Sequence, residues 1–170
     1  MREREIFVVS DTHFGHSNII KYQNRPFANT EQMDKTMLEN WNDTVREQDI
    51  IYHLGDVYFD GGLEYPFEFL KQLKGRKRLL LGNHDEAKDQ VLHSVFEKIM
   101  LWRMFPEYRL LLTHLPMHMD EDPPAFTKYD INVHGHIHGN PAPTPKHINV
   151  SVELTDYTPV NILALVGGIK

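Results

Sequence analysis

The first half of the chain alternates short apolar runs with stretches in which apolar residues recur at helical spacing. Ile6–Val9 is apolar at every position, so the first strand, at Glu5–Ser10, is expected to be buried on both faces. The other elements expected in this half are helices at about 30–47, 65–73 and 86–93, strands at Ile50–Leu54 and Lys77–Leu81, and a polar loop at 12–29. Alternating strands and helices predict parallel strands joined by right-handed crossovers.

The second half, from Val95 onward, consists mainly of short apolar runs that are separated in several places by Pro and Gly. These runs predict strands at Glu97–Leu101, Arg109–Thr113, Ile131–His134, Ile148–Leu154 and Val160–Val166. Two proline-rich stretches, Pro123-Pro124 and 141–145, indicate exposed loops. The whole pattern predicts an α/β protein with either one mixed sheet or two sheets.

Composition changes this picture little. The chain has 170 residues, which fits one core, so residues 1–170 are interpreted as a single domain. Apolar residues make up 41% and charged residues 25%, an ordinary globular balance that favours disorder only at the ends. There is no cysteine, which excludes disulfides and thiolate zinc sites and fits a reducing compartment.

Charge and terminal sequences bear on location and partners. Met1–Glu5 is charged and leads directly into the first strand, unlike a signal peptide, and Ile162–Val166 is too short to cross a bilayer. We therefore expect a cytoplasmic protein without a membrane partner. The net charge is −6 and the longest basic stretch is Arg76-Lys77-Arg78, which argues against an extended nucleic-acid-binding face. A phosphate substrate is still compatible, because bound cations would offset ligand carboxylates.

Five polar clusters each follow an apolar run, and together they contain side chains that bind metal ions. The clusters are Asp11-Thr12-His13, Gly55-Asp56, Gly82-Asn83-His84-Asp85, His114 and Gly135-His136-Ile137-His138. Carboxylates, imidazoles and a carbonyl oxygen at strand ends suit two divalent ions bridged by one carboxylate. The seven candidate metal ligands are Asp11, His13, Asp56, Asn83, His114, His136 and His138. This assignment leaves His84 as an acid–base candidate.

Each cluster alone also fits a structural role, such as a polar strand end, a turn, a helix cap or a hydrogen-bonded histidine. Their joint occurrence in this order favours the metal centre. A structural zinc site is disfavoured, because such sites are closed and usually cysteine-rich. Two nearby residues are candidate substrate contacts: His16, for which a solvated loop position is an equal alternative, and Arg25, for which a structural ion pair is favoured.

In these motifs the chain resembles the calcineurin-like metallophosphoesterases, whose pattern is D-x-H, G-D, G-N-H-[DE], H and G-H-x-H in that order. The match runs from Asp11 to His138, and the neighbouring residues are similar to those of small bacterial and phage phosphoesterases. The resemblance implies a four-layer α/β/β/α sandwich with two mixed β-sheets and a dinuclear metal site at the carboxyl ends of strands. Many members carry Asp or His three places after the second motif, whereas here Asp60 comes one place later, so we leave Asp60 out of the site.

The resemblance also implies roles for the individual residues. The first ion would be held by Asp11, His13, Asp56 and His138, and the second by Asp56, Asn83, His114 and His136. His84 would contact the phosphate and protonate the leaving oxygen, and Asp85 would orient His84. Manganese is the first expectation for both ions, while Fe, Zn, Ni and Co also suit mixed nitrogen and oxygen ligands.

These inferences predict a metal-dependent hydrolase of phosphoesters in which a hydroxide bridging two ions attacks phosphorus. The segments between motifs are short and leave no cap domain to enclose a small monoester, so a phosphodiesterase acting on a small phosphoester or nucleotide is favoured. One alternative is a phosphomonoesterase, either a nucleotide or a protein phosphatase. The other is a catalytically silent binding scaffold of the same fold.

Overall fold

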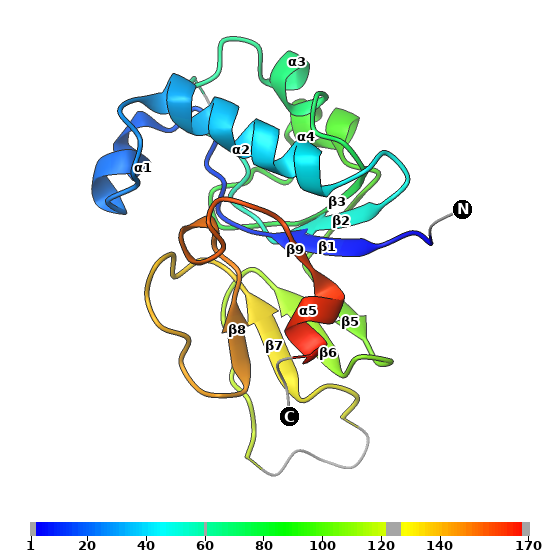
Figure 1. Cartoon of the computed structure of the whole chain (residues 1–170). Coiled ribbons are helices and arrows are strands. Elements are labelled where there is room, and N and C mark those ends of the chain that lie inside the picture. The colour runs from blue at the N-terminus through cyan, green and yellow to red at the C-terminus, as the bar shows by residue number, and fades with distance from the viewer. Residues whose placement is uncertain (1–2, 60, 122–126, 168–170) are drawn as a thin grey trace.

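The computed structural model describes residues 3–59, 61–121 and 127–167 and contains two β-sheets packed face to face (Figure 1). Asp60 and the Pro123-Pro124 turn lie outside the described residues. The first sheet carries a layer of helices on its outer side, and the second sheet lies on its inner side (Figure 1).

The first sheet has the strand order β4-β3-β2-β1-β9. Its strands are β1 (Ile6–Val9), β2 (Ile50–His53), β3 (Arg76–Leu80), β4 (Lys98–Met100) and β9 (Val160–Asn161). Strands β1 to β4 pair in parallel and β9 pairs antiparallel with β1. The expected parallel strands are therefore confirmed, and β1 has a neighbouring strand on each side.

The second sheet has the strand order β5-β6-β7-β8. Its strands are β5 (Trp102–Phe105), β6 (Leu110–Thr113), β7 (Ile131–His134) and β8 (His147–Asn149). The β5–β6 pair is antiparallel and the other pairs are parallel, so both sheets are mixed, as predicted. Strand β5 was not expected, because it lies at the edge and its first two residues are exposed, which leaves only a weak apolar pattern.

Strand alternation sends side chains to two separate cores. In β1, Phe7 and Val9 face the helices, whereas Val8 faces the second sheet. Leu79 and Leu80 divide in the same way in β3. This explains why the strands of the first sheet are apolar at consecutive positions: both of their faces are covered.

The helices are α1 (Ser17–Tyr22), α2 (Thr30–Thr44), α3 (Pro66–Leu70), α4 (Gln90–Val95) and α5 (Ile162–Gly167). Helix α2 begins where expected, because the Asn29 side chain accepts a hydrogen bond from the Gln32 N–H. Helix α4 begins later than predicted, because Asp89 caps it by accepting from the Val91 N–H. Helix α1 was missed inside the predicted polar loop.

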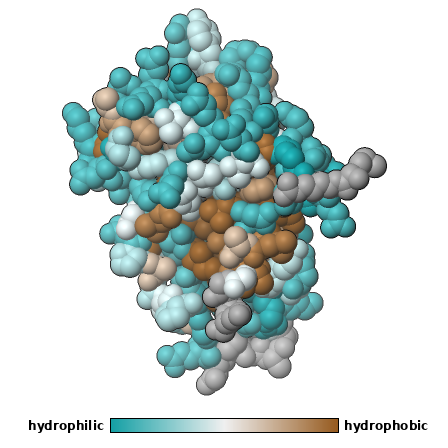
Figure 2. Space-filling view, in the orientation of Figure 1, coloured by the Kyte–Doolittle hydropathy of each residue, from teal (hydrophilic) through white to brown (hydrophobic). Residues whose placement is uncertain are grey.

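The C-terminal elements correct two further predictions. The expected strand Ile148–Leu154 is only partly extended and ends in a 3₁₀ turn, Val152–Leu154, and most of the expected strand Val160–Val166 is helix α5. Ile162 packs into the core between the sheets, so α5 alone represents the second helical layer in the described residues. Hydrophobic residues gather at the surface around α5, whereas the helical layer above it is mainly hydrophilic (Figure 2). No helix in the described part of the chain is both long and apolar enough to cross a membrane.

We expect the core between the sheets to contribute strongly to stability. Leu112→Ala removes a fully buried side chain from this core and should lower the free energy of unfolding by about 2–5 kcal/mol in urea denaturation. Leu163→Ala, at a position of α5 that is 56% exposed, is the control and should change the free energy by less than about 0.5 kcal/mol. Equal losses in the two variants would contradict this account of the core.

Candidate metal centre

Parallel strands bring the polar clusters to one edge of the molecule. Strands β1, β2 and β3 run parallel in the first sheet, and β6 and β7 run parallel in the second. The clusters at Asp11, Asp56 and Asn83 follow the carboxyl ends of the first three strands, and those at His114 and His136 follow the other two. The backbone links these ends, because the Asp11 N–H donates to the Gly55 carbonyl and the Gly135 N–H donates to the His114 carbonyl.

Several candidate ligands have a left-handed backbone conformation. Five of the nine non-glycine residues with positive φ in the described chain are predicted ligands: Asp11 (59°), His13 (49°), Asp56 (58°), His136 (67°) and His138 (51°). Such conformations cost about 1–3 kcal/mol each and persist only where the surrounding structure fixes them. This concentration of strain indicates that the loops are shaped to direct side chains inward.

The first group of ligand atoms comes from Asp11, His13 and His138, whose atoms all lie within 4.8 Å of one another. One Asp11 oxygen, Oδ2, accepts hydrogen bonds from the His136 N–H and the Ser151 hydroxyl, at 2.9 and 3.0 Å. The other oxygen, Oδ1, and Nε2 of His13 are buried and make no hydrogen bond to any described residue. Buried polar atoms without partners are rare, so these two atoms fit a cation.

The second group comes from Asp56, His114 and His136. Asp56 lies between the two groups, because its Oδ2 is 3.5 Å from His13 Nε2 and 3.6 Å from His114 Nε2. Its Oδ1 accepts the His84 N–H at 2.9 Å. The amide oxygen of Asn83 lies 2.9 Å from His114 Nε2, which adds Asn83 to the second group.

Hydrogen bonds fix which imidazole nitrogen faces the ligand groups. Nδ1 of His114 lies 2.7 Å from the Leu54 carbonyl oxygen and must donate to it, so its Nε2 carries the lone pair. Nδ1 of His138 lies 3.0 Å from Glu153 Oε1 and donates in the same way. A carboxylate or carbonyl behind a histidine commonly orients metal ligands in this manner.

Arg25 and Glu153 form an ion pair behind the first group. Nε and Nη2 of Arg25 lie 3.0 and 2.7 Å from Glu153 Oε1, and the remaining guanidinium donors reach the Asp11 and Thr12 carbonyls and the Met33 sulfur. All five donors are thus used inside the protein, and Arg25 is 4% exposed. The structure favours the ion-pair interpretation of Arg25 over the predicted substrate contact.

The sequence did not identify Glu153 as a residue of the site, because Glu153 lies in a predicted strand and outside every motif. The structure places it in the 3₁₀ turn Val152–Leu154, within hydrogen-bonding distance of both His138 and Arg25. An acidic residue a short distance after the G-H-x-H motif was the only signal in the sequence.

Asp85 also has a role different from the predicted orientation of His84. Its Oδ2 accepts the N–H groups of Asp56 and Gly82, both at 2.8 Å, and its Oδ1 accepts the Val57 N–H at 2.9 Å. The Asp85 carboxylate therefore holds the loop that carries Asp56 against the loop that follows β3.

His84 and His16 both lie beside His13. The His84 residue is exposed, and its ring centroid is 5.6 Å from that of His13. The His16 ring lies 5.5 Å from the His13 ring and stacks on Phe59 at 4.4 Å. Both rings therefore adjoin the first group, and their roles toward a substrate stay predictions.

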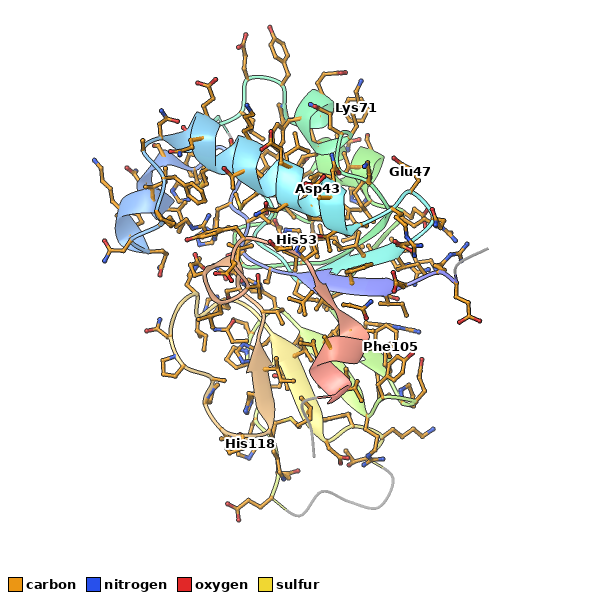
Figure 3. All side chains as sticks on the ribbon, viewed as in Figure 1. Asp43, Glu47, His53, Lys71, Phe105 and His118 are labelled. Atoms are coloured by element: carbon orange, nitrogen blue, oxygen red, sulfur yellow. The ribbon has the colours of Figure 1, made fainter. Side chains whose placement is uncertain are left out.

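His53 is a structural histidine, as its position on a strand suggested. It is buried in the interior (Figure 3), where its Nε2 lies 2.9 Å from the Thr12 hydroxyl and its Nδ1 accepts the Gly55 N–H at 3.2 Å. Burial lowers the pKa of His53 to about 3, so the ring is neutral. Through these contacts with Thr12 and Gly55, His53 supports the loops of the first two motifs.

Two motif glycines allow the carboxylates to approach the backbone. A Cβ atom at Gly82 would lie 2.2 Å from Asp56 Oδ1, and one at Gly135 would lie 2.2 Å from Asp11 Oδ2. Any other residue at these positions would displace a ligand carboxylate. Steric contact with the carboxylates thus requires glycine at the positions before Asn83 and His136.

Electrostatics suit cation binding. Burial lowers the pKa of His13 to about 2, helped by the Arg25 charge, so its imidazole is neutral and able to coordinate a metal. Burial also raises the pKa of the Asp56 carboxyl, although His114 opposes the shift. Burial alone would lower the pKa of His138, but the hydrogen bond that it donates to Glu153 and the Asp11 charge raise it. A bound cation would compensate the buried carboxylates.

Comparisons with known proteins agree with this arrangement. The model of a family described as calcineurin-like phosphoesterase matches residues 5–148. The uncharacterized protein MJ1445 of Methanocaldococcus jannaschii is 38% identical over 95% of this chain and 89% of its own length. The gene 66 protein of Mycobacterium phage L5 is 33% identical over 45% of this chain and 37% of its own length.

Two solved structures have a similar fold. The protein of unknown function AQ665 from Aquifex aeolicus has a TM-score of 0.78 and 27% identity, with 98% of this chain and 100% of that chain covered. The nuclease MPE of Pseudomonas putida has a TM-score of 0.51 and 20% identity, with 79% of this chain and 62% of that chain covered. The likeness to the nuclease concerns the fold alone.

The position of Asp56 leads to a prediction about metal binding. Asp56→Asn keeps the size of the side chain and tolerates the left-handed backbone, but it removes the shared negative charge. We expect affinity for Mn²⁺ to fall at least about tenfold, measured by isothermal titration calorimetry and by metal analysis after dialysis. Asp43→Asn, on the exposed surface of α2 (Figure 3), is the control. Two ions bound to Asp56→Asn with unchanged affinity would contradict the shared role.

The ion pair behind His138 leads to a second prediction. Glu153→Gln keeps the shape of the side chain but removes the negative charge that holds Arg25 and the His138 N–H, so one of two Mn²⁺ sites should weaken by about 10–100-fold while the other stays unchanged. Calorimetry with a two-site analysis measures this difference. The matched control is Glu39→Gln, whose side chain is 61% exposed. Equal weakening of both sites, or of neither, would show that Glu153 does not position His138.

Proposed function

The chain belongs to the calcineurin-like phosphoesterase family, and on this basis we propose that it hydrolyses phosphodiesters with two divalent metal ions. The observation that carries the proposal is the position of the Asp56 carboxylate between two groups of ligand atoms. Structural metal sites hold one ion in a closed shell, whereas two adjoining groups that share a carboxylate suit hydrolysis.

The residues present fit two divalent cations. Asp11, His13, His138 and the shared Asp56 would hold the first ion, and the second would be held by Asp56, Asn83, His114 and His136. When bound, the two ions supply Lewis acidity toward phosphoryl oxygens and lower the pKa of water. We propose manganese for both sites, with Fe, Zn, Ni and Co as alternatives that these nitrogen and oxygen donors also suit.

His84 is the proposed general acid. Its N–H donates to Asp56 Oδ1, which fixes the backbone, while the exposed ring beside His13 is accessible to substrate. Water adds to phosphorus and loses one proton to the solvent as the ester P–O bond breaks, and the protonated His84 ring gives its proton to the departing oxygen. Such proton transfer contributes about 10²–10⁴-fold to a rate.

The remaining motif residues would keep this geometry in place. Asp85 binds three N–H groups of the surrounding loops, and Arg25 binds the carbonyl of Asp11. Interactions of this kind hold reacting groups within the narrow range of positions that catalysis needs. We therefore assign Asp85 and Arg25 positioning roles, and we propose His16 as an additional substrate contact because its ring adjoins that of His13.

A diester is favoured because Asn83 and His84 are exposed at the edge of the site, which leaves room for a second substituent on phosphorus. The net charge of −6 supports a small phosphoester or nucleotide as substrate rather than a long nucleic acid held through many phosphates. Phosphomonoester hydrolysis is the alternative activity of the same centre.

The proposal predicts that His84→Ala lowers kcat for bis(para-nitrophenyl) phosphate with Mn²⁺ by about 10²–10⁴-fold while both ions stay bound. Release of nitrophenolate measures turnover, and metal analysis shows that the site is loaded. His118→Ala is the control, because its side chain is 91% exposed and lies at the opposite end of the molecule from the helical layer (Figure 3).

Three outcomes would change the proposal. Full turnover by His84→Ala would remove this residue from the mechanism. Faster hydrolysis of para-nitrophenyl phosphate than of the diester would favour the phosphomonoesterase. The absence of all turnover in the metal-loaded wild type would favour a binding scaffold.

A further inference from the structure

An apolar pocket of about 630 Å³ opens directly beside the second group of ligands. Asn83 and His114 belong both to this group and to the pocket lining. His84, in contrast, lines a separate recess of about 300 Å³ together with Tyr58 and Asp89. A substrate bound across both ligand groups would therefore meet different surroundings on its two sides.

The pocket is formed on the outer face of the second sheet. Trp102 pairs with Thr113, and Met104 pairs with Leu111, and all four side chains line the pocket. Alternate residues of β5 and β6, such as Leu112, point instead into the core between the sheets. In the described residues every helix packs on the first sheet or on the core between the sheets, so no described helix covers this face.

Exposed apolar side chains are concentrated around the pocket. Of the ten large hydrophobic residues that are exposed in the described chain, four line it: Leu101 (69%), Trp102 (59%), Leu115 (47%) and Met117 (46%). A contiguous exposed apolar surface next to a polar site is typical of a ligand-binding surface. Tyr129 adds a second aromatic ring to the lining.

We propose that this pocket binds an aromatic group on the substituent that stays attached to phosphorus, and so selects aromatic phosphodiesters. The inference rests on the proposed function. The ring of His84, the proposed donor to the leaving group, adjoins His13 of the first ligand group, whereas the pocket adjoins the second group through Asn83 and His114. Its volume is within the range of about 300–1,000 Å³ that is usual for small-molecule sites and far exceeds what a methyl group needs.

The chemistry of the lining favours an aromatic ring. Trp102 and Tyr129 can stack on a ring or meet its edge, and the leucine and methionine side chains cover its faces. The exposed side chain of Asn83 is among the few polar groups in the lining and adjoins the place where a ring with polar atoms would lie. A nucleobase and a simple aryl group share this chemistry, and hydrolysis of esters that carry one or the other distinguishes them.

The test uses three diesters with the same para-nitrophenolate leaving group and different retained groups: methyl, phenyl and the nucleoside thymidine. In the Mn²⁺-loaded wild type, kcat/KM should be higher for the phenyl and thymidine esters than for the methyl ester. Trp102→Ala should lower kcat/KM for the two aromatic esters by about tenfold, mainly through KM, and leave the methyl ester unchanged. A selective loss for thymidine identifies a nucleobase site, and a selective loss for phenyl identifies an aryl site.

Matched variants separate binding from folding. Trp102→Phe keeps an aromatic ring and should retain most of the selectivity, while Leu115→Ala changes the rim independently and should reduce it. Leu163→Ala, at an exposed apolar position on α5 that is not among the residues lining the pocket, should have no effect. Unchanged unfolding midpoints in urea confirm that the variants are folded.

The proposal is overturned if Trp102→Ala affects all three esters equally or none of them. It is also overturned if sedimentation shows a wild-type dimer that Trp102→Ala dissociates without loss of selectivity, because the pocket would then be an interface between copies of the chain. If the wild type hydrolyses none of the esters, the proposed function fails. Binding of phenylphosphonate and methylphosphonate to the Mn²⁺-loaded protein then tests the aromatic pocket independently. Equal affinity for the two phosphonates would exclude the pocket as an aromatic site.

Discussion

The buried Asp56 carboxylate is the interaction on which the rest of the site depends. One oxygen lies between His13 and His114, which come from different sheets, and the other accepts the N–H of His84. A buried carboxylate is costly unless positive charge and hydrogen bonds compensate it. The position of Asp56 therefore requires that loops from the two sheets lie close together. Asp85 and Gly82 allow this close approach of the neighbouring loops.

Much of the fold follows from short-range patterns, and the exceptions have physical causes. The apolar runs at β1 and β2 predict buried strands because both faces of the first sheet are covered. Strand β5 and helix α1 lack such a pattern, since one is an exposed edge and the other is mainly polar. The run that begins at Ile162 is apolar throughout, and periodicity cannot distinguish a short buried helix from a strand in such a run.

The site could be predicted as a list of residues but not as a set of contacts. The motifs named the side chains that the structure brings together in two groups, and their role as metal ligands stays a prediction. Glu153, the true partner of Arg25, belongs to no motif, and the carboxylate of Asp85 binds backbone N–H groups that no pattern of side chains reveals. Contacts of this kind depend on how loops from distant strands meet, which local sequence does not encode.

The bond between Arg25 and Glu153 joins residues that are 128 positions apart. The ligand group at Asp11 also needs His138, which is held in place by the same glutamate. A growing chain that has not yet reached residue 153 lacks this support, whatever its first strands have already formed. The complete first group of candidate ligands, with its supporting ion pair, therefore forms only after synthesis has passed residue 153.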